Sequence, residues 1–248
     1  GNEGASAGHT AGTLEENTEE RIPLAVQMKE TAINVQIWKS YHDIVDISLI
    51  SPAGVQIGPI PEVIGTQRFV VGDTEILLYY GEPSPFHVSQ EIFIEFLPKD
   101  SYITPGIWQF VLTPRKIVTG EYDLWLPSEN VLNRGTAFRY PTERGTLTIP
   151  STSQRVISVG AYDSLTFAYA DFSGRGGLEG ESKPDLVAPG VDITAPTPSG
   201  IYQTFTGTSF ATPFVSGAAA LMMEWGIVRG NDPYLYGEKV KAYMQRGA

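Results

Sequence analysis

Cysteine is absent from the 248 residues, which excludes disulfide bonds, thiol nucleophiles and thiolate metal sites. Basic residues are scarce, because 17 lysines and arginines stand against 28 aspartates and glutamates, a net charge of −11. So acidic a chain is not expected to bind nucleic acid. No uninterrupted run approaches the roughly 18 apolar residues that span a bilayer, so no membrane partner is expected. With 42% hydrophobic residues, the sequence predicts folded domains with a sizeable core.

Three blocks of different composition follow one another along the chain. Residues 1–20 have the Gly, Ala, Thr and Glu composition of a loop and predict a connector. Residues 21–144 contain short alternating apolar runs broken by Gly, Pro and Asp, and predict eight or nine strands of a jelly-roll β-sandwich. Residues 145–248 have an α/β pattern, so the β block is expected to be an insertion. The elements expected in the last block are strands at 156–161 and 185–188 and helices at 209–225 and 237–245.

Period-two alternation is the signal for the strands. The clearest runs are Ile33-Val35-Ile37, Val45-Ile47-Leu49, Ile92-Ile94-Phe96, Trp108-Phe110-Leu112 and Tyr122-Leu124-Leu126. The helix at 209–225, in contrast, is apolar nearly all round, which predicts that it is buried.

Ser209 is the strongest candidate for a functional residue. It stands at the expected start of a helix, in the run Gly207-Thr208-Ser209-Phe210-Ala211-Thr212-Pro213. A hydroxyl at a helix N-terminus has free N–H groups and the positive end of the dipole beside it, and both would stabilise an oxyanion. Pro213 is expected in the first turn, where amides lack helical partners. A bare Gly-Thr-Ser by itself more often means that Ser209 or Thr208 simply caps a helix.

The unbroken pattern Gly-Thr-Ser-x-Ala-x-Pro, followed by a helix of small residues, resembles the nucleophile motif of the subtilases, the subtilisin-like serine proteases. Residues 183–191 (Lys-Pro-Asp-Leu-Val-Ala-Pro-Gly-Val) are similar to the strand and turn that precede this motif in the family. Residues 158–161 and 172–176 are similar to an earlier strand and loop of the family. This resemblance implies a subtilisin-like α/β fold and a nucleophilic Ser209.

The first residues resemble a further subtilase segment, Gly-Asn-x-Gly, as Gly1-Asn2-Glu3-Gly4. The resemblance implies that the Asn2 side chain and the Ser209 backbone N–H donate to the oxyanion. It also implies that the substrate pocket is lined by Gly1, Glu3, Gly207 and Thr208.

A large all-β insertion is unusual among plain subtilisins and resembles the clostridial spore-germination proteases, a branch whose members carry a jelly-roll insert and act on a cortex-lytic pro-enzyme. Residues 8–9, 223–227 and 237–240 are similar to that branch. The resemblance implies a bacterial protein that is spore-associated or extracytoplasmic, and needs no cofactor for catalysis. Because subtilases often bind calcium, calcium is a candidate ligand. Asp163, Asp171 and Asp192 are candidates to bind it, although their spacing is not diagnostic.

Histidine is scarce, and this bears on catalysis, since a serine nucleophile needs a base and an orienting carboxylate. In subtilases both lie upstream of the oxyanion asparagine, in Asp-Thr/Ser-Gly and His-Gly-Thr segments, and neither motif occurs in this sequence. The three histidines, His9, His42 and His87, stand in loop or turn contexts. We therefore expect the C-terminal part of a truncated protease, inactive alone.

Such a chain would have two protein partners, a peptide substrate and the missing N-terminal half. Without that half, apolar surface from Val215, Leu221 and Met222 should be exposed and should cause self-association.

Two other functions stay open. The parent protein would be a pseudoprotease, acting by binding, if its upstream Asp or His were lost. Alternatively, the β insert would be the functional part, as a binding or stabilising module. Its prominent aromatic residues are expected mainly in the core: Trp38, Tyr79, Tyr80, Trp108 and Trp125.

Overall fold

The computed structural model describes residues 1–63, 65–177 and 183–247. The chain divides into two compact units. One is Ser6–Thr142, called the β unit here, and the other combines Gly1–Ala5 with the chain from Glu143 onward, called the α/β unit. The α/β unit is therefore built from two separate segments of the chain, which flank the β unit in sequence.

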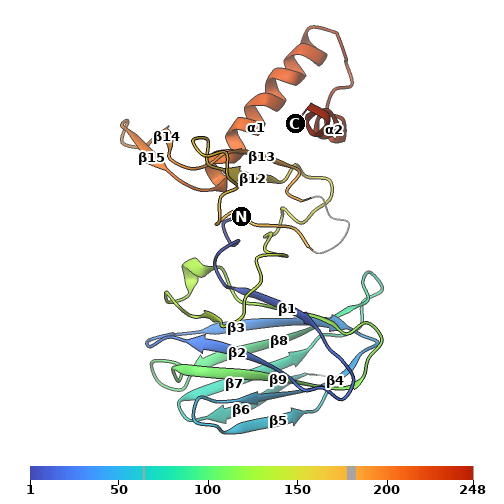
Figure 1. Cartoon of the computed structure of the whole chain (residues 1–248), viewed down its shortest axis with the longest axis vertical. Helices are drawn as coiled ribbons and strands as arrows, with labels where there is room; N and C mark the ends of the chain where they lie inside the picture. Colours follow the sequence, from blue (N-terminus) through green and yellow to red (C-terminus); the bar gives the residue numbers. More distant parts are fainter. Residues whose placement is uncertain (64, 178–182, 248) are drawn as a thin grey trace. The chain divides into compact units, whose positions relative to one another are not determined.

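The β unit consists of two antiparallel sheets, drawn in blue to green in Figure 1. The six-stranded sheet has the order β1-β10-β3-β8-β7-β6, and the five-stranded sheet has the order β11-β2-β9-β4-β5. The elements are β1 His9–Thr13, β2 Glu20–Val26, β3 Ile33–Ser40, β4 Ile44–Ile50, β5 Gln56–Ile60, β6 Thr66–Val71, β7 Thr74–Tyr80, β8 Ser89–Pro98, β9 Gly106–Lys116, β10 Glu121–Trp125, the 3-10 turn η1 Glu129–Val131 and β11 Ala137–Phe138.

Strand β1 corrects the prediction for residues 1–20, which expected only a loop. Its sequence, His-Thr-Ala-Gly-Thr, has no apolar alternation, so nothing local indicated a strand. The strand exists because β10 offers it a complete antiparallel partner, from His9 opposite Trp125 to Thr13 opposite Glu121. The β unit accordingly begins at Ser6, whereas composition had placed the boundary between residues 20 and 21.

The alternating runs are confirmed as strands, and their apolar residues form one core between the sheets. In β3, for example, Ile33, Val35 and Ile37 are at most 1% exposed, while the residues between them face outward. Trp108 lies at the centre of this core, edge-on to Phe96 with ring centroids 5.1 Å apart.

The prediction that the aromatic residues are mainly core holds for only two of the five. Trp108 and Tyr80 are buried in the core. Trp38, Tyr79 and Trp125 occupy the alternate strand positions and lie partly exposed on the outer face of the six-stranded sheet. Aromatic content alone does not distinguish the two faces of a strand. The register does.

The α/β unit begins with two parallel strands, β12 Val159–Tyr162 and β13 Leu186–Pro189. An antiparallel hairpin follows, of β14 Ile193–Pro196 and β15 Tyr202–Phe205. The helices are α1 Thr208–Met223, which continues as the π-helix η2 Glu224–Val228, and α2 Glu238–Gly247. The parallel pair, α1 and α2 confirm the α/β pattern expected after residue 145, and in Figure 1 α1 extends away from β12 and β13.

A small core joins α1 to the two parallel strands. It consists of Val159, Ala161, Ala170, Ala188 and Ala211, with Val215 packed against it. Four of the five buried members are alanines, so the helix lies close to the strands. This packing fixes the N-terminal turns of α1, where Ser209 is located.

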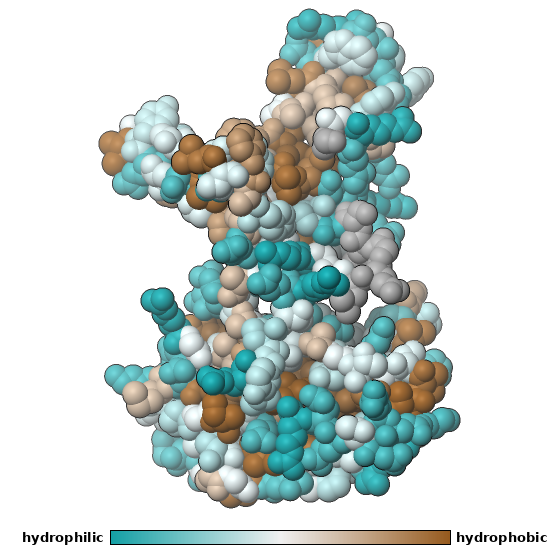
Figure 2. Space-filling view, in the orientation of Figure 1, coloured by the Kyte–Doolittle hydropathy of each residue, from teal (hydrophilic) through white to brown (hydrophobic). Residues whose placement is uncertain are grey.

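The expectation that α1 is buried is wrong beyond its first turns. Within α1 only Thr208 and Ala211 are buried, whereas Phe214 is 49% and Leu221 68% exposed. Figure 2 shows hydrophobic side chains along this helix at the surface. The sequence is apolar all round, but the described residues cover one side only. The expected exposure is thus confirmed for Leu221, while Val215 and Met222 are partly buried.

Thr208–Val228 also has the length and composition of a membrane span, with a mean hydropathy of 1.2 over 18 residues, of which 11% are buried. This corrects the expectation that no segment reaches that threshold. The run is interrupted by Ser, Gly and Pro, but Leu, Met, Ala and Val raise its average. Core helices of water-soluble proteins meet the same criterion, so the evidence for a membrane span is weak.

Candidate active site

Ser209 is the second residue of α1, and its side chain is exposed. The N-cap residue is Gly207, and no side chain caps the helix. The alternative role of this motif was that Ser209 or Thr208 caps the helix. The structure shows no such cap. The first N–H groups of α1 remain beside an exposed hydroxyl, which is the arrangement expected of an oxyanion-binding nucleophile.

Pro213 lies inside α1, as its sixth residue, and not in the first turn as predicted. A proline there lacks the N–H that would bond the carbonyl four residues earlier, and that carbonyl belongs to Ser209. The prediction failed because the helix begins at Thr208, before the serine. The consequence is that the backbone of Ser209 has one fewer helical hydrogen bond.

Asn2 contacts the start of this helix across 206 positions of sequence. Its Oδ1 accepts hydrogen bonds from the Thr208 N–H and the Thr208 hydroxyl, both at 2.9 Å. These bonds hold the amide oxygen toward Thr208. Among the residues that the structure describes, nothing accepts a hydrogen bond from Asn2 Nδ2, so this N–H₂ group is available as a donor. It lies close to Gly207, since a Cβ on that residue would be 3.2 Å from it.

The segment that carries Asn2 is held by the loop at 171–174, which overlaps the 172–176 segment noted in the sequence. The Gly4 N–H donates to the Phe172 carbonyl at 2.9 Å, and the Gly174 N–H donates to the Gly1 carbonyl at 3.0 Å. A Cβ at Gly4 would clash with the Ser173 carbonyl oxygen and lie 2.7 Å from that of Asp171. Glycine is therefore required here by close backbone approach.

Gly207 connects the hairpin to α1 in a backbone conformation that favours glycine, with φ of 152°. Its N–H donates to the Gly190 carbonyl at 2.8 Å, which ties the helix start to the end of β13. A Cβ on Gly190 would in turn lie 2.6 Å from the Ala161 Cβ. The Pro-Gly and Gly-Thr-Ser segments are thus packed against each other and position the serine.

An aromatic pair flanks Ser209, and sequence reasoning did not find it. Phe205, in β15, stacks on Phe210 with ring centroids 4.9 Å apart and an interplanar angle of 9°. Two phenylalanines five positions apart around a serine were the only available signal. The stack fixes the residue that directly follows Ser209.

All three histidines lie in the β unit, away in sequence from Ser209. His9 belongs to β1 rather than to the expected loop. It is buried, lies 2.9 Å from Asp123 and stacks on Trp125. His42 contacts the Ser40 hydroxyl, and His87 Nδ1 donates to the Ser89 carbonyl at 2.7 Å. Each ring thus has partners within its own unit.

No group of three or more His, Asp and Glu residues suited to a metal ion occurs in the described part of the chain. Of the suggested calcium ligands, Asp163 accepts hydrogen bonds from the Leu165 N–H at 2.8 Å and the Thr166 hydroxyl at 3.0 Å, and these lower its pKa. Asp192 receives a long bond from the Thr206 hydroxyl at 3.5 Å. The partners of Asp163 lie in its own turn, whereas that of Asp192 is 14 residues away, and Asp171 is exposed.

A buried ion cluster supports the unit and was also missed from the sequence. The Asp185 carboxylate, 3% exposed, lies 2.9 Å from Lys183 Nζ and 2.8 Å from Lys241 Nζ. It accepts the Ser158 N–H at 2.7 Å. Burial raises the pKa of Asp185, but these hydrogen bonds and lysine charges outweigh burial and lower it. The cluster therefore joins α2 to both parallel strands.

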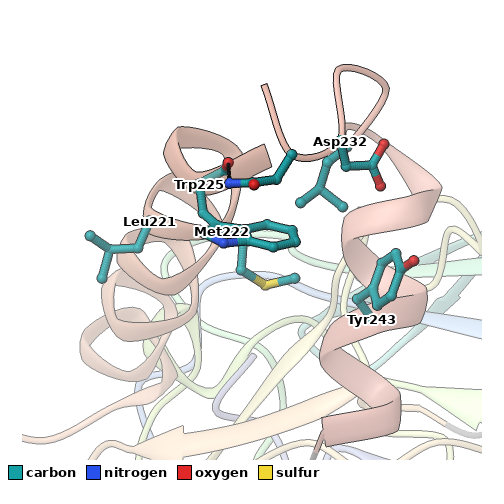
Figure 3. Close-up of a pocket in the computed structure, with 7 residues that line it drawn as sticks. Leu221, Met222, Trp225, Asp232 and Tyr243 are labelled. Carbon is teal, nitrogen blue, oxygen red and sulfur yellow. Dashed lines mark hydrogen bonds between the residues drawn. The ribbon is translucent and has the colours of Figure 1, made fainter. Parts of the chain in front are cut away.

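A hollow of about 460 Å³ lies between the C-terminal half of α1 and α2, lined by Leu221, Met222, Trp225, Asn231, Asp232, Leu235 and Tyr243. In Figure 3, Met222 and the Trp225 ring point toward Tyr243 of α2. Because an α-helix rises about 1.5 Å per residue, this region is roughly 18 Å from Ser209 along the helix. The hollow is thus separate from Ser209.

The chain is similar to known proteins. The sequence profile of the subtilase family matches residues 140–248. The intracellular serine protease of Paenibacillus polymyxa is 38% identical over 102 residues, which cover 40% of this chain and 29% of that protein. Serine protease AprX of Bacillus subtilis is 34% identical over 123 residues, covering 41% and 26%.

One solved structure matches the entire chain. The CspB protease of Clostridium perfringens is similar with a TM-score of 0.92 and 39% identity, over 100% of this chain and 52% of that one. The chain therefore spans about half the length of that protease and little more than a quarter of the two curated relatives. The match confirms the subtilisin-like fold and the resemblance to the clostridial proteases.

Proposed function

We propose that this chain, whose residues 140–248 belong to the subtilase family, is the C-terminal portion of a serine endopeptidase. The observation that carries the proposal is the contact of Asn2 with Thr208, beside Ser209. This contact brings Asn2 to the helix start that carries Ser209, although the two residues are far apart in sequence. Ser209 would attack the carbonyl carbon of the substrate, and Asn2 would bind its oxygen. Their intact state favours a protease over a pseudoprotease.

In this function Ser209 Oγ attacks the carbonyl carbon of the scissile peptide bond. The oxyanion that forms accepts hydrogen bonds from Asn2 Nδ2 and from the Ser209 N–H at the helix start. Gly207 and Thr208, together with Gly1 and Glu3, line the pocket for the residue before the scissile bond. The base that takes the serine proton, and the carboxylate that orients it, come from the missing N-terminal half.

The similarity to a clostridial protease supports a more specific proposal for the protein that is cleaved. We infer a protein pro-enzyme of spore germination, which the resemblance of residues 8–9, 223–227 and 237–240 to that branch also suggests. Calcium remains a candidate ligand and is not required for the chemistry proposed.

A jelly-roll topology for the β unit fits the strand order. Most connections cross from one sheet to the other, since β1, β3, β8 and β10 lie in one sheet and β2, β4, β5 and β9 in the other. The exception among these strands is the β4–β5 hairpin, which stays within one sheet. Within each sheet these strands follow the orders β1-β10-β3-β8 and β2-β9-β4-β5. Such orders arise when a long hairpin folds across two sheets, as in jelly rolls. The β6–β7 hairpin widens the first sheet.

The exposed side of α1 supports a protein partner. Phe214, Leu221, Trp225 and Val228 are between 49% and 79% exposed and follow one another at helical spacing. An apolar surface of this kind is normally covered. We infer that the missing N-terminal half covers it in the complete protease, and that isolated chains associate through it.

The test compares the complete protease with the 1–248 chain, using hydrolysis of a peptide substrate and labelling by a fluorophosphonate. The complete protein should hydrolyse the peptide and react at Ser209, and Ser209→Ala should abolish both. The 1–248 chain should do neither, because it supplies no base. Robust hydrolysis by the 1–248 chain alone would contradict the prediction that it is inactive. A complete protein that is folded but unreactive would favour the pseudoprotease hypothesis.

A further inference from the structure

A second hollow, of about 140 Å³, lies in the β unit where β3, β8 and the start of β10 meet. The residues that matter for its chemistry are Trp38, Ser40, Ser89, Thr119, Glu121 and Asp123. Register places Trp38 opposite Asp123 and Ser40 opposite Ser89, so these side chains share the outer face of the six-stranded sheet. The proposed proteolysis uses none of them.

The lining combines one large aromatic ring with hydroxyl and carboxylate groups, and Val88 and the buried Lys39 complete it. The Lys39 Nζ donates to the Ser40 and Asp43 carbonyls at 3.2 and 2.8 Å. Trp38 presents an apolar, flat surface, while the serine and threonine hydroxyls both donate and accept hydrogen bonds. The carboxylates of Glu121 and Asp123 accept only. A sugar ring has the complementary chemistry, because one face carries C–H groups and its rim carries hydroxyls. We propose that this hollow binds a neutral carbohydrate chain.

The charge of the hollow selects among sugars. Glu121 is exposed, and the Asp123 side chain, 39% exposed, is oriented by its 2.9 Å contact with His9. Because the Lys39 ammonium is buried and bonded to backbone carbonyls, the charges that face solvent here are the two carboxylates, which would repel phosphate, sulfate or uronic acid groups. The volume is well below the roughly 300–1,000 Å³ of pockets that enclose drug-sized ligands, so one sugar ring is held and the rest of the chain lies outside.

Further aromatic side chains indicate where the remaining sugars lie. Across the sheet, register aligns Trp125 with Gln36, Gln36 with Phe93 and Phe93 with Tyr79, in a row next to that of Trp38. On the opposite side, His87 is edge-on to Trp38 at 5.8 Å, and the neighbouring Phe86 is 92% exposed. Stacking surfaces thus extend in two directions from the hollow, which suits an oligosaccharide better than a single sugar.

The test measures binding of chitohexaose and cellohexaose, two neutral β-linked oligosaccharides, to the 1–248 chain by titration calorimetry. One of them should bind, Trp38→Ala should weaken binding by at least about tenfold, and Trp38→Phe should retain most of it. Glu121→Gln should weaken it less. Tyr234→Ala, which removes an aromatic side chain that is 72% exposed in the α/β unit, is the control and should leave the affinity unchanged.

Two results would overturn the proposal. One is the absence of binding by either oligosaccharide at millimolar concentration to chain that circular dichroism shows to be folded. The other is that a lysine-rich peptide binds and the sugars do not, and that both Trp38→Ala and Glu121→Gln abolish the peptide binding. The true ligand would then be a cation that lies over the indole ring. Ser209→Ala should bind sugar like the unaltered chain, so failure of the protease proposal is distinguishable.

Discussion

At Gly4 the backbone leaves no room for a side chain, because the Ser173 and Asp171 carbonyl oxygens occupy the space of a Cβ. Gly4→Ala should therefore displace the segment that presents Asn2 and, in the complete protease, lower kcat by about 10–100-fold with a smaller effect on KM. Gly177→Ala is the matched control, since open space surrounds the Gly177 position. Equal rates for the two variants would show that Asn2 does not depend on this packing.

Asp185 is the residue whose ionisation should matter most to the α/β unit. Its folded-state pKa is lowered, because hydrogen bonds from Lys241, Ser158 and Lys183 outweigh burial. Its contribution to stability is thus present above the unfolded pKa of about 3.9 and lost as pH falls through the lower folded value. Asp185→Asn should cost about 3–5 kcal/mol, since it leaves buried lysine charges without their partner.

Hydrogen exchange of peptides covering β12 and α2 measures this effect for the α/β unit alone. Protection should fall in the variant at neutral pH, and the difference from the unaltered chain should disappear in acid below the folded pKa. A pH-independent difference would mean that Asp185 acts by shape and not by charge.

At the scale of elements, the turn between β9 and β10 depends on one buried carboxylate. Asp43, 2% exposed, accepts hydrogen bonds from the Val118, Thr119 and Gly120 N–H groups at 2.6, 3.0 and 2.8 Å. Burial raises the pKa of Asp43, but these bonds outweigh it and lower the pKa. Since β10 pairs with both β1 and β3, this turn positions the half of the sheet that carries Trp125.

Asp43→Ala should destabilise the β unit by about 3 kcal/mol or more, because the Val118, Thr119 and Gly120 N–H groups lose their buried acceptor. Asp46→Ala, which removes a surface ion pair with Arg115, should cost less than about 1 kcal/mol and serves as the control. Urea denaturation followed by fluorescence of the buried Trp108 compares them. Equal costs would indicate that the turn is held by its backbone alone.

At the scale of the whole molecule, the uncovered side of α1 should control association. The chain is expected to form dimers or larger species as concentration rises, because Leu221 and Trp225 are 68% and 54% exposed. Leu221→Glu with Trp225→Glu should yield a monomer, whereas Val118→Glu, at a β-unit position that is 60% exposed, should not. Light scattering provides the measurement, and a clean monomer at high concentration would contradict the expectation.

The sequence alone determined the features of this protein that depend on neighbouring residues, such as the alternating strands, their buried sides and the start of α1. Alternation such as Ile33-Val35-Ile37 specifies which side of a strand is buried, and a Gly-Thr-Ser start followed by small residues specifies a helix that can approach a strand pair closely. The place of Ser209 at a helix start was predicted in this way, whereas its role as a nucleophile was inferred from the resemblance of the full motif to the subtilases.

Contacts between distant residues were decided only by the tertiary structure. Strand β1 exists because β10 pairs with it, and Asn2 contacts Thr208 because the loop at 171–174 holds its segment. The outward position of Trp38 beside Asp123 follows from strand register. The burial of only one side of α1 follows from its packing against β12 and β13. These are long-range interactions, whose free energy depends on what the rest of the chain places opposite, so no local pattern contains them.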